Sequence, residues 1–129
     1  MKTKQLAWAS VVLGVCSCVA RRAVAVPPQE TLVRLAELEI DPAQLGAYEA
    51  ALKEEIATSI RLEPGVLKLY AVSVKDHPNQ IRMFEMYRDQ ASYQAHLKTP
   101  HFKRYKMATE HMVKSLTLIE TEPVLLGSR

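Results

Sequence analysis

Residues 84–105 read FEMYRDQASYQAHLKTPHFKRY, and three local structures follow one another in this stretch. Its apolar start completes a strand. Asp89 then provides a carboxylate that caps a short helix. Pro100 opens a second helix that runs to about Lys114. The helical region is broken at Thr99-Pro100, because a proline disfavours helical backbone in the residue before it. The stretch therefore predicts a strand over 81–88 and a helical region that is broken just before Pro100.

The chain before this stretch predicts a strand followed by a helix. Thr31–Ile40 is rich in Leu, Val and Ile, which is typical of a strand. Asp41 follows as a helix N-cap, with Pro42 at the first helical position and Gln44 placed to close a capping box. Apolar side chains then recur at intervals of three and four, which predicts the buried helix face: Leu45, Tyr48, Leu52, Ile56 and Ile60.

A second strand is predicted over Val66–Lys75, after a stop at Glu63-Pro64-Gly65. Both of its faces are apolar, with Val66, Tyr70, Val72 and Val74 on one and Leu67, Leu69 and Ala71 on the other. Residues 76–80, DHPNQ, predict a turn into the strand at 81–88. We expect the last strand over Ser115–Leu126.

The resulting order, β-α-β-β-α-β, predicts an α+β fold with the ferredoxin-like arrangement, in which helices cover one face of an antiparallel sheet. The other face stays open and apolar. Large exposed apolar patches are unusual in soluble monomers. We therefore expect one domain over residues 31–126 that forms a homodimer, sheet against sheet.

The first residues, 1–25, have the features of a signal peptide. A basic start precedes an apolar run over 6–20, and an A-x-A cleavage site ends at Ala25. We expect a periplasmic or secreted protein, with residues 26–30 as a short linker. The alternatives are cleavage after Ala20, a lipid on Cys18, and an uncut membrane anchor.

Removal of residues 1–25 changes the charge of the chain. Four of the 17 basic residues leave and none of the 14 acidic ones, so the formal net charge of +3 becomes −1. A basic patch for nucleic acid or a membrane surface is therefore not expected. Both cysteines and the single tryptophan also leave, which excludes a disulfide, a thiol nucleophile and a zinc–thiolate site in the mature chain.

The quoted stretch resembles the antibiotic biosynthesis monooxygenase family, whose members carry an aromatic-Glu strand, an acidic cap and an "aHL.TPHf" block. Residues 62–72, LEPGVLKLYAV, are similar to that family's EPG step into its second strand. The resemblance covers nearly all of residues 31–126 and implies a dimeric α+β barrel. Within the family, the chain is most similar to quinol monooxygenase-like proteins and to an isomerase of a phosphorylated autoinducer-2 breakdown product. The haem-degrading branch is less similar, because it relies on a tryptophan.

This resemblance implies a small pocket under the helices that works without a metal or an organic cofactor, on an aromatic substrate and O2. Such chemistry needs a base, and a neutral imidazole near pH 7 is suited to that task. It also needs donors for the resulting oxyanion, and a carboxylate could orient the base. The catalytic candidates are His96, His101 and Glu85, and the substrate-binding candidates are Tyr70, Tyr87 and Tyr105.

Each candidate also has a purely structural interpretation. The histidines could serve backbone groups at helix ends, and the tyrosines could be half-buried amphipathic residues. His77 in the predicted turn and His111 late in the second helix are not expected at the site. No metal site is predicted, because no spacing of His, Asp and Glu suggests three convergent ligands. The four glycines form no phosphate-binding loop.

The function predicted from the sequence is that of an exported, cofactor-independent monooxygenase acting on a quinol or similar small aromatic. Two alternatives stay open. One is an isomerase of a small ketone in the same fold, and the other is a non-catalytic, ligand-binding dimer.

The export prediction can be tested by intact-mass measurement of protein recovered from outside the cytoplasm. The mass should correspond to residues 26–129. A mass that retains residues 1–25 without a lipid would contradict soluble export, and a diacylated Cys18 would indicate a membrane-tethered protein instead.

Overall fold

The computed structural model describes residues 30–127. The predicted signal peptide, 1–25, and the linker before Glu30 lie outside the described residues. Within 30–127, no helix has both the length and the hydropathy that a membrane span requires.

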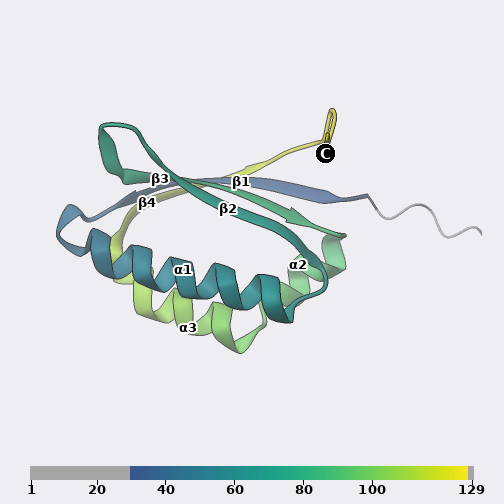
Figure 1. The fold of residues 1–129 in the computed structure, drawn as a ribbon, viewed down its shortest axis with the longest axis horizontal. Helices are drawn as coiled ribbons and strands as arrows, with labels where there is room; N and C mark the ends of the chain where they lie inside the picture. Colours follow the sequence, from purple (N-terminus) through teal and green to yellow (C-terminus); the bar gives the residue numbers. More distant parts are fainter. Residues whose placement is uncertain (1–29, 128–129) are drawn as a thin grey trace, which may run out of the picture.

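Between Glu30 and Gly127, four strands and three α-helices follow the predicted order. The strands are β1 Leu32–Ile40, β2 Val66–Val74, β3 His77–Tyr87 and β4 Val113–Glu120. The helices are α1 Leu45–Leu62, α2 Gln90–His96 and α3 Pro100–Thr109, with short 3₁₀ turns at Pro42–Gln44 and Glu110–Met112. The sheet is antiparallel with the order β2-β3-β1-β4, and all three helices lie on one side of it (Figure 1). The ferredoxin-like α+β prediction is confirmed.

Of the two predicted helix caps, Asp89 is confirmed, and Thr99 provides a further cap that was not predicted. Asp89 accepts a hydrogen bond from the Ser92 backbone N–H at 2.6 Å and starts α2. Thr99 accepts one from Phe102 N–H at 3.3 Å and starts α3. Asp41, however, caps the 3₁₀ turn through Ala43 N–H. The predicted capping box with Gln44 is absent, because that turn separates Asp41 from the start of α1.

Three element boundaries differ clearly from the prediction. The predicted second helix ends at Thr109, followed by the 3₁₀ turn to Met112, and does not reach Lys114, which lies in β4. The hairpin turn is only Lys75-Asp76, and His77–Gln80 belongs to β3, because Gln80 pairs with Glu39 of β1. Asp76 adopts a φ of 65°, which lets so short a turn close. The last strand starts at Val113 and ends at Glu120, where its pairing with Arg34 of β1 ends. The predicted strand over 121–126 is therefore not formed.

The buried face of α1 changes along the helix. In its first half, Tyr48 and Leu52 pack on the sheet against a core that includes Ile40 and Met83. In its second half, Glu55 and Ser59 are buried, whereas Ile60 is 49% exposed. The predicted apolar face is thus confirmed as far as Ile56, which packs against the core, but it is wrong at Ile60, and Glu55 and Ser59 take buried positions in the later turns instead.

A β-bulge corrects the predicted faces of β2. Val66 pairs with Tyr87 and Lys68 with Met86, so Leu67 is an extra residue on this strand. Val66 consequently joins Leu69 on the helix side instead of lying beside Val72. The open side carries one apolar residue from each strand in a single row of the pairing register: Tyr70, Phe84, Leu35 and Ile119.

Gly65 fixes the connection between α1 and β2 against α2. A Cβ at this position would overlap the Ser92 side chain, so the close approach requires glycine. The Gly65 carbonyl also accepts a 2.8 Å hydrogen bond from Arg88 N–H. This contact places Glu63, two residues earlier, beside the joint between α2 and α3.

Candidate active site

The joint between α2 and α3 carries two buried histidines. His96 is the last residue of α2 and is 3% exposed, whereas His101 lies in the first turn of α3 and is 9% exposed. Thr99 fixes their relative position, because its hydroxyl donates to the His96 carbonyl at 2.8 Å while also capping α3. The Thr-Pro step thus brings both imidazoles under the helical layer.

Glu63 connects the two histidines. Its Oε1 lies 3.0 Å from His96 Nδ1 and 2.6 Å from His101 Nε2, so one carboxylate oxygen accepts from both rings. Burial alone would raise the pKa of Glu63, but the hydrogen bonds from His101 and His96 outweigh it and hold the pKa below its ordinary value. An ionised Glu63 fixes the Nδ1–H tautomer of a neutral His96, which leaves the lone pair on Nε2.

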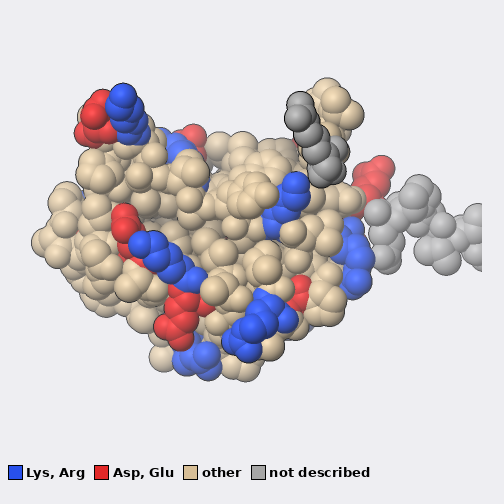
Figure 2. Space-filling view, viewed as in Figure 1, with Lys and Arg blue, Asp and Glu red and all other residues tan. Residues whose placement is uncertain are grey.

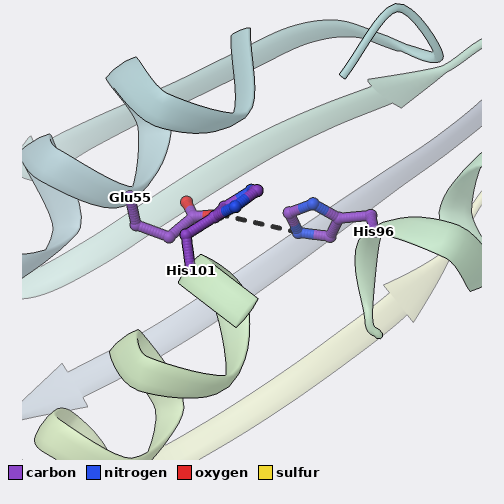
Figure 3. A group of neighbouring side chains, drawn as sticks. All are labelled: Glu55, His96 and His101. Atoms are coloured by element: carbon purple, nitrogen blue, oxygen red, sulfur yellow. Dashed lines mark ion pairs between the residues drawn. The ribbon is translucent and has the colours of Figure 1, made fainter. Parts of the chain in front are cut away.

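Glu55 lies on the other side of the His96 ring. Its Oε1 is 3.8 Å from His96 Nε2, and it accepts a 2.7 Å hydrogen bond from Ser59 one turn along α1. Figure 3 shows Glu55 from α1, His96 from α2 and His101 from α3 converging on one point. The ligand atoms of these three residues lie within 4.8 Å of one another. The sequence analysis did not predict this convergence.

A cavity of about 250 Å³ lies between the sheet and the helices beside this cluster. Four aromatic side chains contribute to its walls: Tyr87, Tyr93, Phe102 and Tyr105. The His96 ring lies between two of them, with ring centroids 5.4 Å from Tyr87 and 4.6 Å from Phe102. Leu116 and Leu118 of β4 line the cavity too, yet they are 41% and 51% exposed, so the cavity opens at the β4 edge.

A larger hollow of about 560 Å³ lies between α1 and the edge strand β2. Its charged lining residues are Glu49 and Lys53, and these form a surface ion pair with each other at 3.6 Å. No buried histidine or carboxylate faces it. The smaller cavity beside His96 is therefore the better candidate for chemistry.

The structure brings together most of the candidates predicted from the sequence. His96, Glu85, Tyr87 and Tyr105 line the cavity. His101 contributes through Glu63 instead of lining the cavity itself. His77 and His111 lie on the surface, as expected.

Tyr70 does not join the site. It is 56% exposed and stacks near Phe84 on the open side of the sheet, with ring centroids 6.4 Å apart. The bulge at Leu67 shifts the register of β2 and thereby decides which of its residues face the helices. The predicted substrate-binding role of Tyr70 is therefore not supported by its position.

Sequence reasoning missed Glu55, Glu63, Tyr93 and the cavity-lining role of Phe102. For Glu55 the sequence did offer a signal. The structure buries positions 48, 52, 55 and 59 of α1, and their helical spacing places the Glu55 carboxylate on the same face as Tyr48 and Leu52. For Glu63, the EPG step was noted as the end of a helix and as part of the family resemblance, but Glu63 was not named as a site residue. Nothing in the local sequence shows that this residue meets histidines more than 30 positions later.

The hydroxyls of Tyr87 and Tyr105 stay protonated at neutral pH. Burial and the neighbouring Glu85 raise the pKa of Tyr87, whose hydroxyl donates to Glu85 Oε2 at 3.1 Å. Burial and Tyr48 likewise raise the pKa of Tyr105, and the two hydroxyls lie 2.7 Å apart. Because Tyr87 already donates to Glu85, the Tyr48–Tyr105 pair is the better source of a proton donor for a bound oxyanion.

The fold and the cavity define a ferredoxin-like α+β protein with a small aromatic pocket under its helices and a His–Glu cluster at the pocket wall. The sequence model of the antibiotic biosynthesis monooxygenase family matches residues 31–108. The chain belongs to this family.

Solved structures agree with this assignment. A protein from Bacteriodes thetaiotaomicron VPI-5482, described provisionally as an antibiotic biosynthesis monooxygenase, is 50% identical over 78% of this chain and 95% of its own, with a TM-score of 0.75. A provisional monooxygenase from Lactobacillus acidophilus NCFM is 34% identical over 68% of this chain and 42% of its own, with a TM-score of 0.67. A Pseudomonas aeruginosa protein, 23% identical with a TM-score of 0.69, shares the fold. Among curated proteins, none matches the chain.

The partly buried Glu85 leads to a prediction about stability and pH. Burial raises the pKa of this carboxyl above its ordinary value of 4.5. The protonated form is therefore favoured in the folded state, and its contribution to stability is present below the ordinary pKa and lost as pH rises through the folded-state pKa. Glu85→Gln should unfold at a higher denaturant concentration than the wild type at pH 7, and this difference should shrink towards zero below pH 4.5.

Glu39→Gln on strand β1 is the matched control, because Glu39 is exposed and should show no such pH dependence. A stability difference for Glu85→Gln that stays constant with pH would contradict the proposed cause.

Proposed function

We propose that this protein is a monooxygenase of small electron-rich aromatics, with a hydroquinone or similar polyphenol as substrate and O2 as co-substrate. Membership of the antibiotic biosynthesis monooxygenase family supports the reaction class. The aromatic walls support a planar, apolar substrate. A cavity of about 150 Å³ holds benzene in another protein, so about 250 Å³ is enough for a substituted single ring.

One observation carries the proposal: His96 lines the cavity while its Nδ1 donates to Glu63 at 3.0 Å. The remaining nitrogen, Nε2, is the acceptor that a phenolic O–H requires. After proton transfer the imidazolium lies between two carboxylates, Glu63 at 3.0 Å and Glu55 at 3.8 Å, which stabilise its positive charge. The resulting phenolate is electron-rich enough to react with oxygen.

The substrate itself supplies the electrons in this reaction. A hydroquinone that loses its phenolic proton to His96 donates electrons to O2, one oxygen atom enters the ring, and the other leaves as water. The product is a hydroxyquinone, so one hydroquinone and one O2 give one hydroxyquinone and one H2O. The protein provides the base, a hydroxyl donor from the Tyr48–Tyr105 pair, and walls that limit water.

Two further features complete the proposal. The amino-terminal sequence supports export, which would place the enzyme in the periplasm or outside the cell. The apolar row Tyr70, Phe84, Leu35 and Ile119 supports a homodimer in which the open faces of two sheets meet. Figure 2 shows basic and acidic residues interspersed on the visible face, which offers no single-sign surface for nucleic acid.

Replacement of the proposed base gives the main test of function. His96→Gln should lower turnover of a hydroquinone by roughly 10²- to 10⁴-fold, the usual contribution of a general base. His111→Gln is the matched control, since His111 is an exposed histidine outside the cavity and its loss should leave turnover unchanged. With ¹⁸O2, mass spectrometry should find one labelled oxygen in the product.

Other outcomes separate the alternatives. A folded His96→Gln variant with wild-type turnover would contradict the base assignment. Hydrogen peroxide and unlabelled quinone would indicate an oxidase, and a product formed from a small ketone without O2 would indicate the isomerase. Binding of aromatics without turnover would indicate a ligand-binding protein.

The dimer has its own test in sedimentation velocity at micromolar concentration. Ile119→Lys on the open face should convert the dimer to a monomer, because a charge placed within an apolar interface must be desolvated. Ile60→Lys on α1 is the matched control, since Ile60 is also exposed but lies outside the sheet. A wild-type protein that sediments as a monomer would contradict this part of the proposal.

A further inference from the structure

The cluster of Glu55, His96 and His101 has the composition of a transition-metal site. Two imidazoles and one carboxylate provide ligand atoms within 4.8 Å of one another, from three different helices (Figure 3). Such sets bind Zn²⁺, Fe²⁺, Co²⁺ or Mn²⁺, whereas Mg²⁺ and Ca²⁺ favour oxygen ligands alone. The ligand set therefore favours a divalent transition metal.

The spacing of the ligand atoms also fits a metal better than a direct contact. The 3.8 Å between His96 Nε2 and Glu55 Oε1 is too long for a hydrogen bond. Two ligands that each lie about 2.0–2.2 Å from a tetrahedral Zn²⁺ are separated by roughly 3.3–3.5 Å. A shift of about half an ångström would thus bring these two atoms to the separation that a shared ion requires.

Hydrogen bonds behind the ligands provide the support that metal sites usually have. His96 Nδ1 donates to Glu63 at 3.0 Å, which is the carboxylate–histidine arrangement that orients a ligating imidazole and raises its basicity. Ser59 donates to Glu55 Oε1 at 2.7 Å and holds that carboxylate in place. The same Glu63 oxygen also accepts from His101. All three ligand side chains are thus held by neighbouring groups.

The local charge favours a cation as well. Within residues 30–127, the ion-pair partners found for Glu55 and Glu63 are histidines, and no lysine or arginine pairs with either carboxylate. Glu55 is 4% exposed, and a buried carboxylate needs a compensating positive charge. A divalent ion would supply it.

We propose that Glu55, His96 and His101 bind one divalent transition-metal ion, with Zn²⁺ as the representative species and Glu63 and Ser59 as the groups that orient the ligands. Binding occupies the lone pair of His96 Nε2. That lone pair is also the proton acceptor in the proposed function, so a bound ion inhibits oxidation of the aromatic substrate. This inhibition rests on the proposed function, whereas the binding of the ion does not.

Binding is measured directly, without reference to turnover. The full chain is used without a polyhistidine tag and with Cys16 and Cys18 changed to Ser, so that no thiol competes for the ion. Calorimetry with Zn²⁺ at pH 7.5 should give one ion per chain, and Co²⁺ should give visible d–d absorption. Zn²⁺ should also raise the melting temperature, because the ion binds the folded state.

Variants assign the site. Glu55→Gln and His101→Gln should each weaken Zn²⁺ binding by at least about 100-fold, and Ser59→Ala by about 10- to 100-fold, the usual effect of losing an outer hydrogen bond. His111→Gln, which removes an exposed histidine outside the cluster, should bind as the wild type does. Circular dichroism without metal identifies variants that remain folded, and only these are compared.

The two parts of the proposal fail separately. Wild-type affinity in folded Glu55→Gln and His101→Gln, or fewer than about 0.5 ions per chain in the parent protein, would overturn the metal site. Stoichiometric binding that leaves hydroquinone turnover unchanged would overturn the inhibition and the role of His96 as base, while the site itself would stand. Inhibition that follows the measured occupancy in the parent, and that shifts to about 10- to 100-fold higher Zn²⁺ concentration together with binding in Ser59→Ala, supports both.

Discussion

The shared carboxylate of Glu63 is the interaction on which the helical layer depends. One of its oxygens accepts from His96 at the end of α2 and from His101 at the start of α3, while Glu63 itself follows the last residue of α1. A single side chain therefore ties three helices together. Without it, two buried imidazoles would lose their partner, and an unsatisfied buried polar group costs about 1–3 kcal/mol.

The backbone around this carboxylate is shaped to deliver it. Gly65 allows the turn after α1 to approach Ser92 more closely than any side chain would permit, and Thr99 fixes the angle between α2 and α3. Throughout the described residues, no buried side-chain nitrogen or oxygen lacks a partner. The polar cluster is thus a fully satisfied network, which holds the His96 ring in one orientation at the cavity wall.

The two faces of the sheet have different roles. On the helix side, Leu116 and Leu118 of β4 extend past the cover of the helices and form the mouth of the cavity. On the other side, apolar residues from all four strands form one row that none of the helices in the described part of the chain covers. The same short sheet therefore supplies a pocket on one face and a surface suited to association on the other.

Local sequence determined the order of elements, the cap at Asp89, the break at Thr99-Pro100 and four of the six candidate residues that line the cavity. The elements, the cap and the break follow from backbone preferences and periodicity within a few residues, whereas the candidate residues came from the family resemblance and the chemistry of their side chains. Tertiary structure alone decided three other things. The bulge at Leu67 moved Tyr70 to the open face, pairing with β2 extended β3 back to His77, and α1 brought Glu55 and Glu63 to histidines that lie more than 30 positions later. Register and helix packing depend on contacts between distant segments, and no local pattern records which residues will meet.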